Sequence, residues 1–187
     1  LRNAASFSLG QDWRYLSDLN IAWADADGQS IRAAEFTEAS IGAAYRPADY
    51  QRFNGLARLH YFEDLGPLGQ LTGSGRTESP KQVSMILSAD GNYSLTQRLT
   101  LGAKYGYRQG KVSLARSSSD FVSSEAHLGV IRADYNAIGA WDILAEARAL
   151  SVSGAHERKL GALLAVYRHL GENVKLGAGY SWSDFSD

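Results

Sequence analysis

The chain has 187 residues, about the size of one domain, and its 19 basic and 20 acidic residues give a net charge of −1. Because this balance provides no strong positive field, nucleic acid is excluded as an expected partner. The sequence contains no cysteine, which excludes disulfides, thiol nucleophiles and thiolate metal ligands. Nothing marks a boundary between two cores, so we predict that residues 1–187 form a single domain.

Apolar and polar residues alternate with a period of two over much of the chain. The alternation is clearest at residues 99–108 and 174–183, where every second residue on one side of the pattern is apolar or aromatic. This pattern is typical of a β-strand with one apolar and one polar face. Residues 141–150 have a composition that favours helix, but the same alternation predicts a strand there as well. In chain order, the predicted strands lie near residues 3–9, 14–25, 33–46, 52–64, 81–94, 98–109, 124–137, 141–152, 158–169 and 174–185.

The predicted connections between these strands alternate between short and longer ones. In an up-and-down antiparallel sheet this places tight turns at one rim and extended loops at the other, as in bacterial barrels with short periplasmic turns. The two longest loops, at residues 64–79 and 109–123, are expected contact points outside the cell, although their sequences name no ligand. The short connections are predicted at residues 10–12, 47–50, 95–97, 138–140 and 170–173.

We interpret the apolar face of the strands as the outward, lipid-facing one, with tyrosine and tryptophan near the ends of its stripes. Amphipathic rings favour the level of the lipid headgroups, so these residues are predicted to form girdles at the two membrane interfaces. The alternative is that they are core residues of a soluble β-sandwich. The predicted girdles consist of Trp23, Tyr45, Tyr61, Tyr93, Tyr107, Tyr135, Tyr167, Tyr180 and Trp182.

The opposite face carries charged residues whose number is too large for a dry core, which argues against the sandwich. We therefore predict that this face lines the lumen of a barrel. The charges could pair with one another, or, if the lumen conducts, the cations would attract anions and the carboxylates would oppose them. The candidate lumen-facing residues are Asp18, Glu38, Arg58, His60, Lys104, Arg108, Arg132, Asp134, Glu146 and Arg148.

Three parts of the chain resemble a known group of proteins. They are residues 36–47 (FTEASIGAAYRP), residues 99–108 (LTLGAKYGYR), and residues 167–170 (YRHL) followed by 173–180 (NVKLGAGY). These segments look like the C-terminal barrel region of large Gram-negative outer-membrane proteins, and the likeness covers nearly the whole chain. The resemblance implies a location in the cell outer membrane, and it carries over no catalytic motif.

The predicted fold is all-β: an antiparallel up-and-down transmembrane β-barrel with about ten visible strands. The first predicted strand leads into a short turn and would run from outside to inside, whereas such barrels usually begin on the periplasmic side. In the resembling proteins, residues 183–187 look like the start of a loop that leads to one more strand. We therefore expect flanking strands to be missing and the whole barrel to be 12-stranded or larger, although ten strands could also close alone.

Two functions fit such a barrel. The first is an anchor that presents surface domains, with or without a narrow pore; the second is a porin-like channel for small polar solutes. The four histidines, His60, His127, His156 and His169, show no hydrolase motif or metal-ligand spacing, so an outer-membrane hydrolase is the least favoured alternative. We predict no catalytic, cofactor or metal site. The expected partners are outer-membrane lipids and lipopolysaccharide, the barrel assembly machinery, and further domains of the same chain or partner surface proteins.

Overall fold

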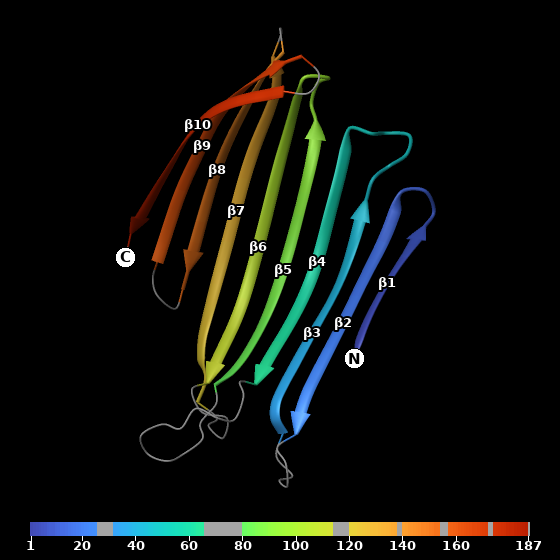
Figure 1. Cartoon of the computed structure of the whole chain (residues 1–187), viewed down its shortest axis with the longest axis vertical. Helices are drawn as coiled ribbons and strands as arrows, with labels where there is room; N and C mark the ends of the chain where they lie inside the picture. Colours follow the sequence, from blue (N-terminus) through green and yellow to red (C-terminus); the bar gives the residue numbers. More distant parts are fainter. Residues whose placement is uncertain are drawn as a thin grey trace.

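The computed structural model describes residues 1–25, 32–65, 80–113, 120–137, 140–153, 157–171 and 174–186. These residues form one sheet of ten β-strands, which follow one another in sequence order as an antiparallel up-and-down meander (Figure 1). No helix in this part of the chain is long and apolar enough to cross a membrane. The strands are β1 (Arg2–Leu9), β2 (Trp13–Asp25), β3 (Arg32–Tyr45), β4 (Phe53–Leu65), β5 (Lys81–Ser94), β6 (Leu99–Ser113), β7 (Val122–Ala137), β8 (Trp141–Val152), β9 (Glu157–Leu170) and β10 (Val174–Ser186).

The ten predicted strands are confirmed, and β6 shows the largest difference, because it continues to Ser113 instead of ending at residue 109. In this extension polar residues such as Lys111 lie on the face that is apolar elsewhere, so the apolar–polar alternation ends there. The backbone of β6 nevertheless continues to pair with β5, as far as Lys81. The loop predicted at residues 109–123 is therefore shorter. Residues 114–119 of that loop, and 66–79 of the other long loop, lie outside the described residues.

The short connections contain the backbone conformations that tight turns require. Gly10 (φ 68°) and Gly171 (φ 73°) are left-handed, which glycine adopts without steric cost. Ala140 (φ 67°) adopts the same conformation under strain, because it has a Cβ atom. Between β5 and β6, Thr96 Oγ1 accepts a hydrogen bond from the backbone N–H of Leu99 at 3.0 Å. These features reverse the chain within a few residues.

Direct partners on neighbouring strands point to the same face of the sheet. From β1 to β8, odd-numbered residues pair with odd-numbered ones, apart from a bulge at Asp25. The odd-numbered face holds residues such as Leu87 and Ile131, and we call it the apolar face; the even-numbered face is the polar face. In β9 and β10 the even-numbered residues lie on the apolar face, because Trp141 pairs with Arg168.

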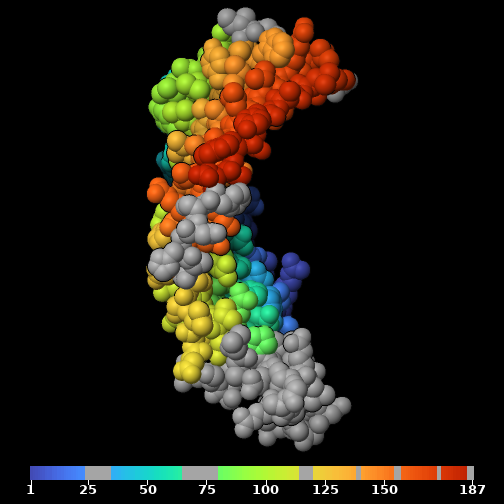
Figure 2. All heavy atoms as spheres, turned by 90° about the vertical axis from the view of Figure 1, so that its left-hand side faces the viewer, coloured from blue at the N-terminus to red at the C-terminus, as the bar shows by residue number. Residues whose placement is uncertain are grey.

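The polar face is the more crowded of the two. Ser40, Ser84 and Ala165 on this face are 4%, 4% and 5% exposed, whereas Ile131 and Leu176 on the apolar face are 66% and 62% exposed. Figure 2 shows the curvature of the sheet from the side, with the red C-terminal strands bending over at the top. Because side chains converge on the inside of a curved sheet and spread apart on its outside, the polar face lies on the inside.

The sheet has two free edges. Within the described residues, β1 pairs only with β2 and β10 only with β9, and these two strands lie at opposite sides of the sheet in Figure 1. Every residue of β1 is exposed, and so are residues 174–184 of β10. The described chain is therefore a curved wall that does not close on itself.

Candidate functional site

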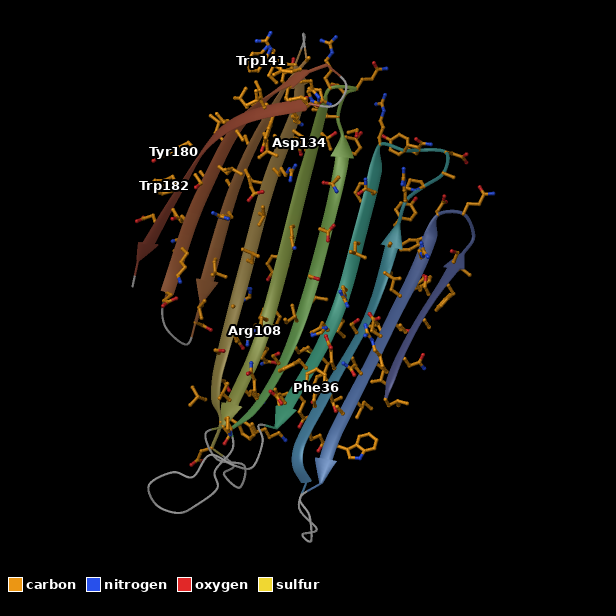
Figure 3. All side chains as sticks on the ribbon, viewed as in Figure 1. Phe36, Arg108, Asp134, Trp141, Tyr180 and Trp182 are labelled. Carbon is orange, nitrogen blue, oxygen red and sulfur yellow. The ribbon has the colours of Figure 1, made fainter. Side chains whose placement is uncertain are left out.

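The ten charged residues predicted for the lumen all lie on the polar face. Each is even-numbered, and they come from β2, β3, β4, β6, β7 and β8, where even-numbered residues share that face. Arg108 and Asp134, labelled in Figure 3, lie toward opposite ends of the sheet, so the set extends along the strands as well as across them. Whether these charges line a lumen stays a prediction, and their contacts determine what they could do there.

On the N-terminal side of the polar face, Asp18, Ser40 and Arg58 form one hydrogen-bonded group across three adjacent strands. Ser40 Oγ donates to Asp18 Oδ2 at 2.9 Å, and Arg58 Nη2 donates to Ser40 Oγ at 2.9 Å and to Asp18 Oδ2 at 3.3 Å. Nearby, His60 Nε2 lies 3.7 Å from Glu38 Oε1. Each of the predicted charges in this region therefore has a partner on another strand.

A second group lies on the polar face near the short connections of β7 to β10. Arg132 donates two hydrogen bonds to Asp134, at 2.7 and 2.8 Å. Asp142 Oδ2 lies 2.6 Å from Lys175 Nζ and 2.7 Å from His169 Nε2. A hollow of about 320 Å³ lies beside these side chains. Sequence reasoning did not single out Asp142 or Lys175, because they are 33 residues apart and come together only when β8 and β10 both pair with β9.

Three of the predicted cations, Lys104, Arg108 and Arg148, form no salt bridge with any described residue. The remaining predicted charge, Glu146, is the direct partner of Arg132 in the register of β7 and β8. Within the described residues, the polar face thus combines ion-paired charges with cations that form no salt bridge.

The prediction that Tyr167 belongs to a lipid-facing aromatic girdle is wrong, although the other eight predicted aromatic residues do lie on the apolar face. Tyr167 lies on the polar face, where Asp142 and Gly177 are its direct partners. A Cβ atom on Gly177 would collide with the Tyr167 ring, and Lys175 Nζ lies 4.8 Å from the ring centroid. The glycine therefore leaves the space that the inward-facing ring fills.

The aromatic end of the apolar face includes residues that the predicted girdles did not contain. Trp13 and Phe53 flank Tyr45, with ring centroids 4.6 and 6.1 Å from that of Tyr45. Farther along the same rim, Arg168 Cζ lies 5.3 Å from the centroid of the Trp141 ring. Trp13, Phe53 and Trp141 are each the first residue of a strand, directly after a short connection. That position was the signal that could have identified them.

Both ends of the apolar face also carry polar contacts. At the end with short connections, the hydroxyls of Tyr50 and Tyr93 are 3.1 Å apart, and this hydrogen bond raises the pKa of Tyr50. At the other end, the Tyr61 hydroxyl donates to Glu63 at 2.6 Å, and Lys81 Nζ lies 2.8 Å from the same carboxylate. These contacts satisfy the polar tips of rings whose bodies remain apolar.

Solved structures with a similar arrangement of strands are known. A crystal structure of the toluene transporter TodX from Pseudomonas putida superposes with a TM-score of 0.53 at 11% sequence identity, covering 98% of this chain and 66% of TodX. A second TodX crystal structure gives a TM-score of 0.49, 12% identity and coverages of 98% and 67%. The β domain of the Bordetella autotransporter BrkA gives 0.37, 17% and coverages of 98% and 81%. Only the first TM-score exceeds 0.5, and the fold comparison rests on it.

No family model matches the chain, and no curated protein matches it in sequence. The strand order, the two-faced alternation and the TodX superposition agree with one another. The fold is that of an outer-membrane β-barrel. This fold belongs in the outer membrane of Gram-negative bacteria, the location that the sequence predicted.

Between its two rims the apolar face is hollowed. The hollow has a volume of about 990 Å³ and is lined by small residues such as Ala103 and Ala147, together with Phe53 of β4 and Trp182 of β10. Twisted sheets are saddle-shaped, so the outside of a curved sheet is still concave along one direction. The predominantly apolar lining makes this hollow part of the lipid-facing surface of the fold.

The described histidines have structural partners. His60 lies beside Glu38, His169 contacts Asp142, and His127 Nδ1 lies 2.8 Å from the hydroxyl of Tyr105 on the apolar face. His156 lies outside the described residues. The superposed TodX structure is described as a transporter, and the lack of an enzymatic activity in this chain stays a prediction.

Proposed function

We propose that the chain forms most of the wall of an outer-membrane β-barrel whose polar lumen passes small polar solutes. The observation that carries this proposal is an open, curved sheet with its charged face on the inside. In a bilayer the backbone groups of a free sheet edge have no water to bond, so β1 and β10 must each acquire a partner. Further strands, from the same or another chain, would complete a barrel of 12 or more strands.

The width of such a barrel favours an aqueous lumen. About eight strands give an interior that side chains can fill, and the interior widens as strands are added. Ten strands already leave the edges β1 and β10 apart here, so the completed barrel would be wider than that limit. Lys104, Arg108 and Arg148 on the polar face form no salt bridge with any described residue, which also favours water in the lumen, because an unpaired charge is very costly in a dry interior.

The second candidate is an anchor that holds surface domains and conducts little. It is favoured by the resemblance of residues 36–47, 99–108, 167–170 and 173–180 to barrel regions of large outer-membrane proteins. In that case lipopolysaccharide, the barrel assembly machinery and domains joined to the barrel would be its partners. TodX is described as a toluene transporter, and at 11% identity that solute is not carried over to this chain.

Closure is tested first, by gel mobility of the refolded 187-residue chain in detergent, with and without boiling. A fast band that slows after boiling would mean that the ten strands close alone, which would contradict the wider barrel. A band that does not shift would support the need for flanking strands.

Conduction is tested with the folded protein extracted from outer membranes and inserted into planar lipid bilayers. We expect stable conductance steps in potassium chloride. Barrels that are folded by gel mobility but produce no steps would contradict the channel and support the anchor.

A further inference from the structure

The hollow of about 320 Å³ on the polar face is lined by charged side chains from three strands. Arg132 and Asp134 belong to β7, Asp142 to β8 and Lys175 to β10. Figure 3 shows Asp134 toward the same end of the sheet as Trp141. The volume lies near the lower end of the range in which proteins bind small ligands. We call this hollow, with its four charged side chains, the paired-charge hollow.

The strand registers bring these side chains together. Asn136 is the direct partner of Asp142, so Asp134, two residues earlier on β7, is a diagonal neighbour of Asp142. Diagonal neighbours on one face have Cα atoms about 7–8 Å apart. Lys175 Nζ reaches Asp142 across β9, where it lies 4.8 Å from the centroid of the Tyr167 ring. Side chains from β7, β8, β9 and β10 therefore meet at one hollow.

Two further residues give the paired-charge hollow an apolar part. Leu144 is 9% exposed and is the direct partner of Asp134, and Tyr167 also lines the hollow. The Tyr167 ring is held in the space that Gly177 leaves free. The hollow therefore combines charged groups with a small apolar surface.

The ion pairs at the hollow leave a donor and an acceptor unused. Arg132 contacts Asp134 through Nε and Nη2, and within the described residues its Nη1 donates no hydrogen bond. Lys175 and His169 both contact Oδ2 of Asp142, and no described residue donates to its Oδ1. A guanidinium N–H and a carboxylate oxygen are thus available on two side chains that line the same hollow.

A ligand with charges of both signs matches these groups. The four charged side chains of the paired-charge hollow sum to zero, and Glu146, the direct partner of Arg132, does not line it. A lone anion would meet Asp134 and Asp142, and a lone cation would meet Arg132 and Lys175. A carboxylate and an ammonium on one molecule would each find an opposite charge, through hydrogen bonds roughly twice as strong as neutral ones.

We propose that the paired-charge hollow binds small zwitterions with an ammonium and a carboxylate group, such as α-amino acids with short side chains. The ammonium donates to Asp142 Oδ1, and the carboxylate accepts from Arg132 Nη1. With hydrogen bonds of about 2.8 Å at both ends, such a molecule spans roughly 8 Å, similar to the spacing between Asp142 and Asp134, beside which the guanidinium lies. Its side chain lies against Leu144 and Tyr167. The proposal rests on the proposed function, because the hollow must be open to water in the lumen.

The test measures the binding of L-alanine to the folded protein, extracted from outer membranes and exchanged into deuterated detergent. The readout is saturation transfer from the protein to the alanine methyl signal in proton NMR. The signal should saturate with alanine concentration, and glycine, which is also a zwitterion, should compete. Acetate, methylammonium and glycerol should each compete about tenfold more weakly, because each lacks at least one of the two charges. Equal competition by glycerol would contradict the proposal in favour of a site for neutral polyols.

Four variants locate the bound alanine. Asp142→Asn and Arg132→Gln should each weaken the apparent affinity about fivefold, as expected for the loss of one charge close to the ligand. The matched control is Asp18→Asn, which removes an ion-paired aspartate from the same face at β2 and should weaken binding less than about twofold. Asn136→Phe keeps every charge but places a ring at the hollow, so it should abolish binding.

All variants are compared only after gel mobility and circular dichroism show that they are folded. Equal losses in Asp142→Asn and Asp18→Asn would overturn the site in favour of a general charge effect. Unchanged binding in Asn136→Phe, or a signal that does not saturate, would also overturn it. The result stands apart from conduction. A protein that binds alanine without conducting would contradict the channel alone, and one that conducts without binding alanine would contradict the zwitterion site alone.

Discussion

Leu87 and Ser88 are neighbours on β5, but they meet different surroundings. Leu87 lies on the apolar face between Leu59 and Tyr107 and is 46% exposed, whereas Ser88 lies on the polar face beside Arg58. The pleat of a strand turns successive side chains to opposite faces, so Leu87 and Ser88 have the same backbone conformation and differ only in the face on which they lie. The difference between them fits a face that meets lipid on the outside and a face that, in the proposed barrel, meets the water of the lumen.

The contrast also distinguishes this sheet from one in a soluble protein. In a soluble sheet the apolar face is packed against a core and the polar face is open to solvent. Here the apolar face is the more exposed one and the polar face is the more crowded. Within the described residues no protein core covers the apolar side chains, which is the arrangement that a lipid-facing wall requires.

Of the variants that test this contrast, Leu87→Arg should cause the largest loss of folding free energy. An arginine on the lipid face near the membrane centre costs about 2–4 kcal/mol, so the folded fraction in lipid vesicles should fall sharply in a urea titration. The matched control is Ser88→Arg at the adjacent position on the polar face, which should cost less than about 1 kcal/mol if that face meets water as proposed. Equal costs for both variants would mean that the faces are assigned wrongly.

Gly177→Ala tests the packing of Gly177 against Tyr167 on the polar face. The added methyl group would collide with the Tyr167 ring, so the free energy of unfolding should fall by about 1–3 kcal/mol. In a Tyr167→Ala background the same change should cost less than about half as much, because the ring is absent. Strictly additive losses in this double-mutant cycle would contradict the inward position of Tyr167.

Ala140→Gly should give a smaller change of the opposite sign. It relieves a left-handed backbone in the connection before β8, which belongs to neither face, and should raise the free energy of unfolding by about 0.5–1 kcal/mol. Gly171→Ala, at a left-handed glycine in the next short connection, should lower it by a similar amount. The same urea titration measures these turn variants, so their changes in unfolding free energy can be compared with those of the face variants. A loss of stability in Ala140→Gly would contradict a strained backbone at Ala140.

Arg58→Gln should have the smallest effect. The side chains of Arg58 and Asp18 are 49% and 52% exposed, and ion pairs at such exposure contribute about 0.5 kcal/mol. Urea unfolding in lipid vesicles measures the change. A loss above about 3 kcal/mol would indicate a dry environment around Asp18, as in the core of a soluble sandwich, and would remove the basis for an aqueous lumen.

Most of the strands and their two faces could be predicted because both are local properties. Residues 99–108 alternate strictly, and a period of two identifies both the strand and the side on which each residue lies. In β9 the pattern is ambiguous, since Leu163 and Leu164 are adjacent and face opposite sides. The face of Tyr167 therefore depended on the register between Trp141 and Arg168, which no local pattern contains.

The candidate site was only half predictable for the same reason. Alternation placed Arg58 and Lys104 on one face, but it could not say that Arg58 is paired with Asp18 while Lys104 has no ionic partner among the described residues. The contact between Asp142 and Lys175 likewise joins residues from two strands that are not neighbours.

The sequence by itself determined that this protein is a meander of two-faced strands, because side-chain polarity and the pleat of a strand act over two residues. Only the tertiary structure decided which charges neutralise one another, which rings point inward, and that the edges β1 and β10 stay apart. These properties depend on register and curvature, which are set by all the strands together and not by any one of them.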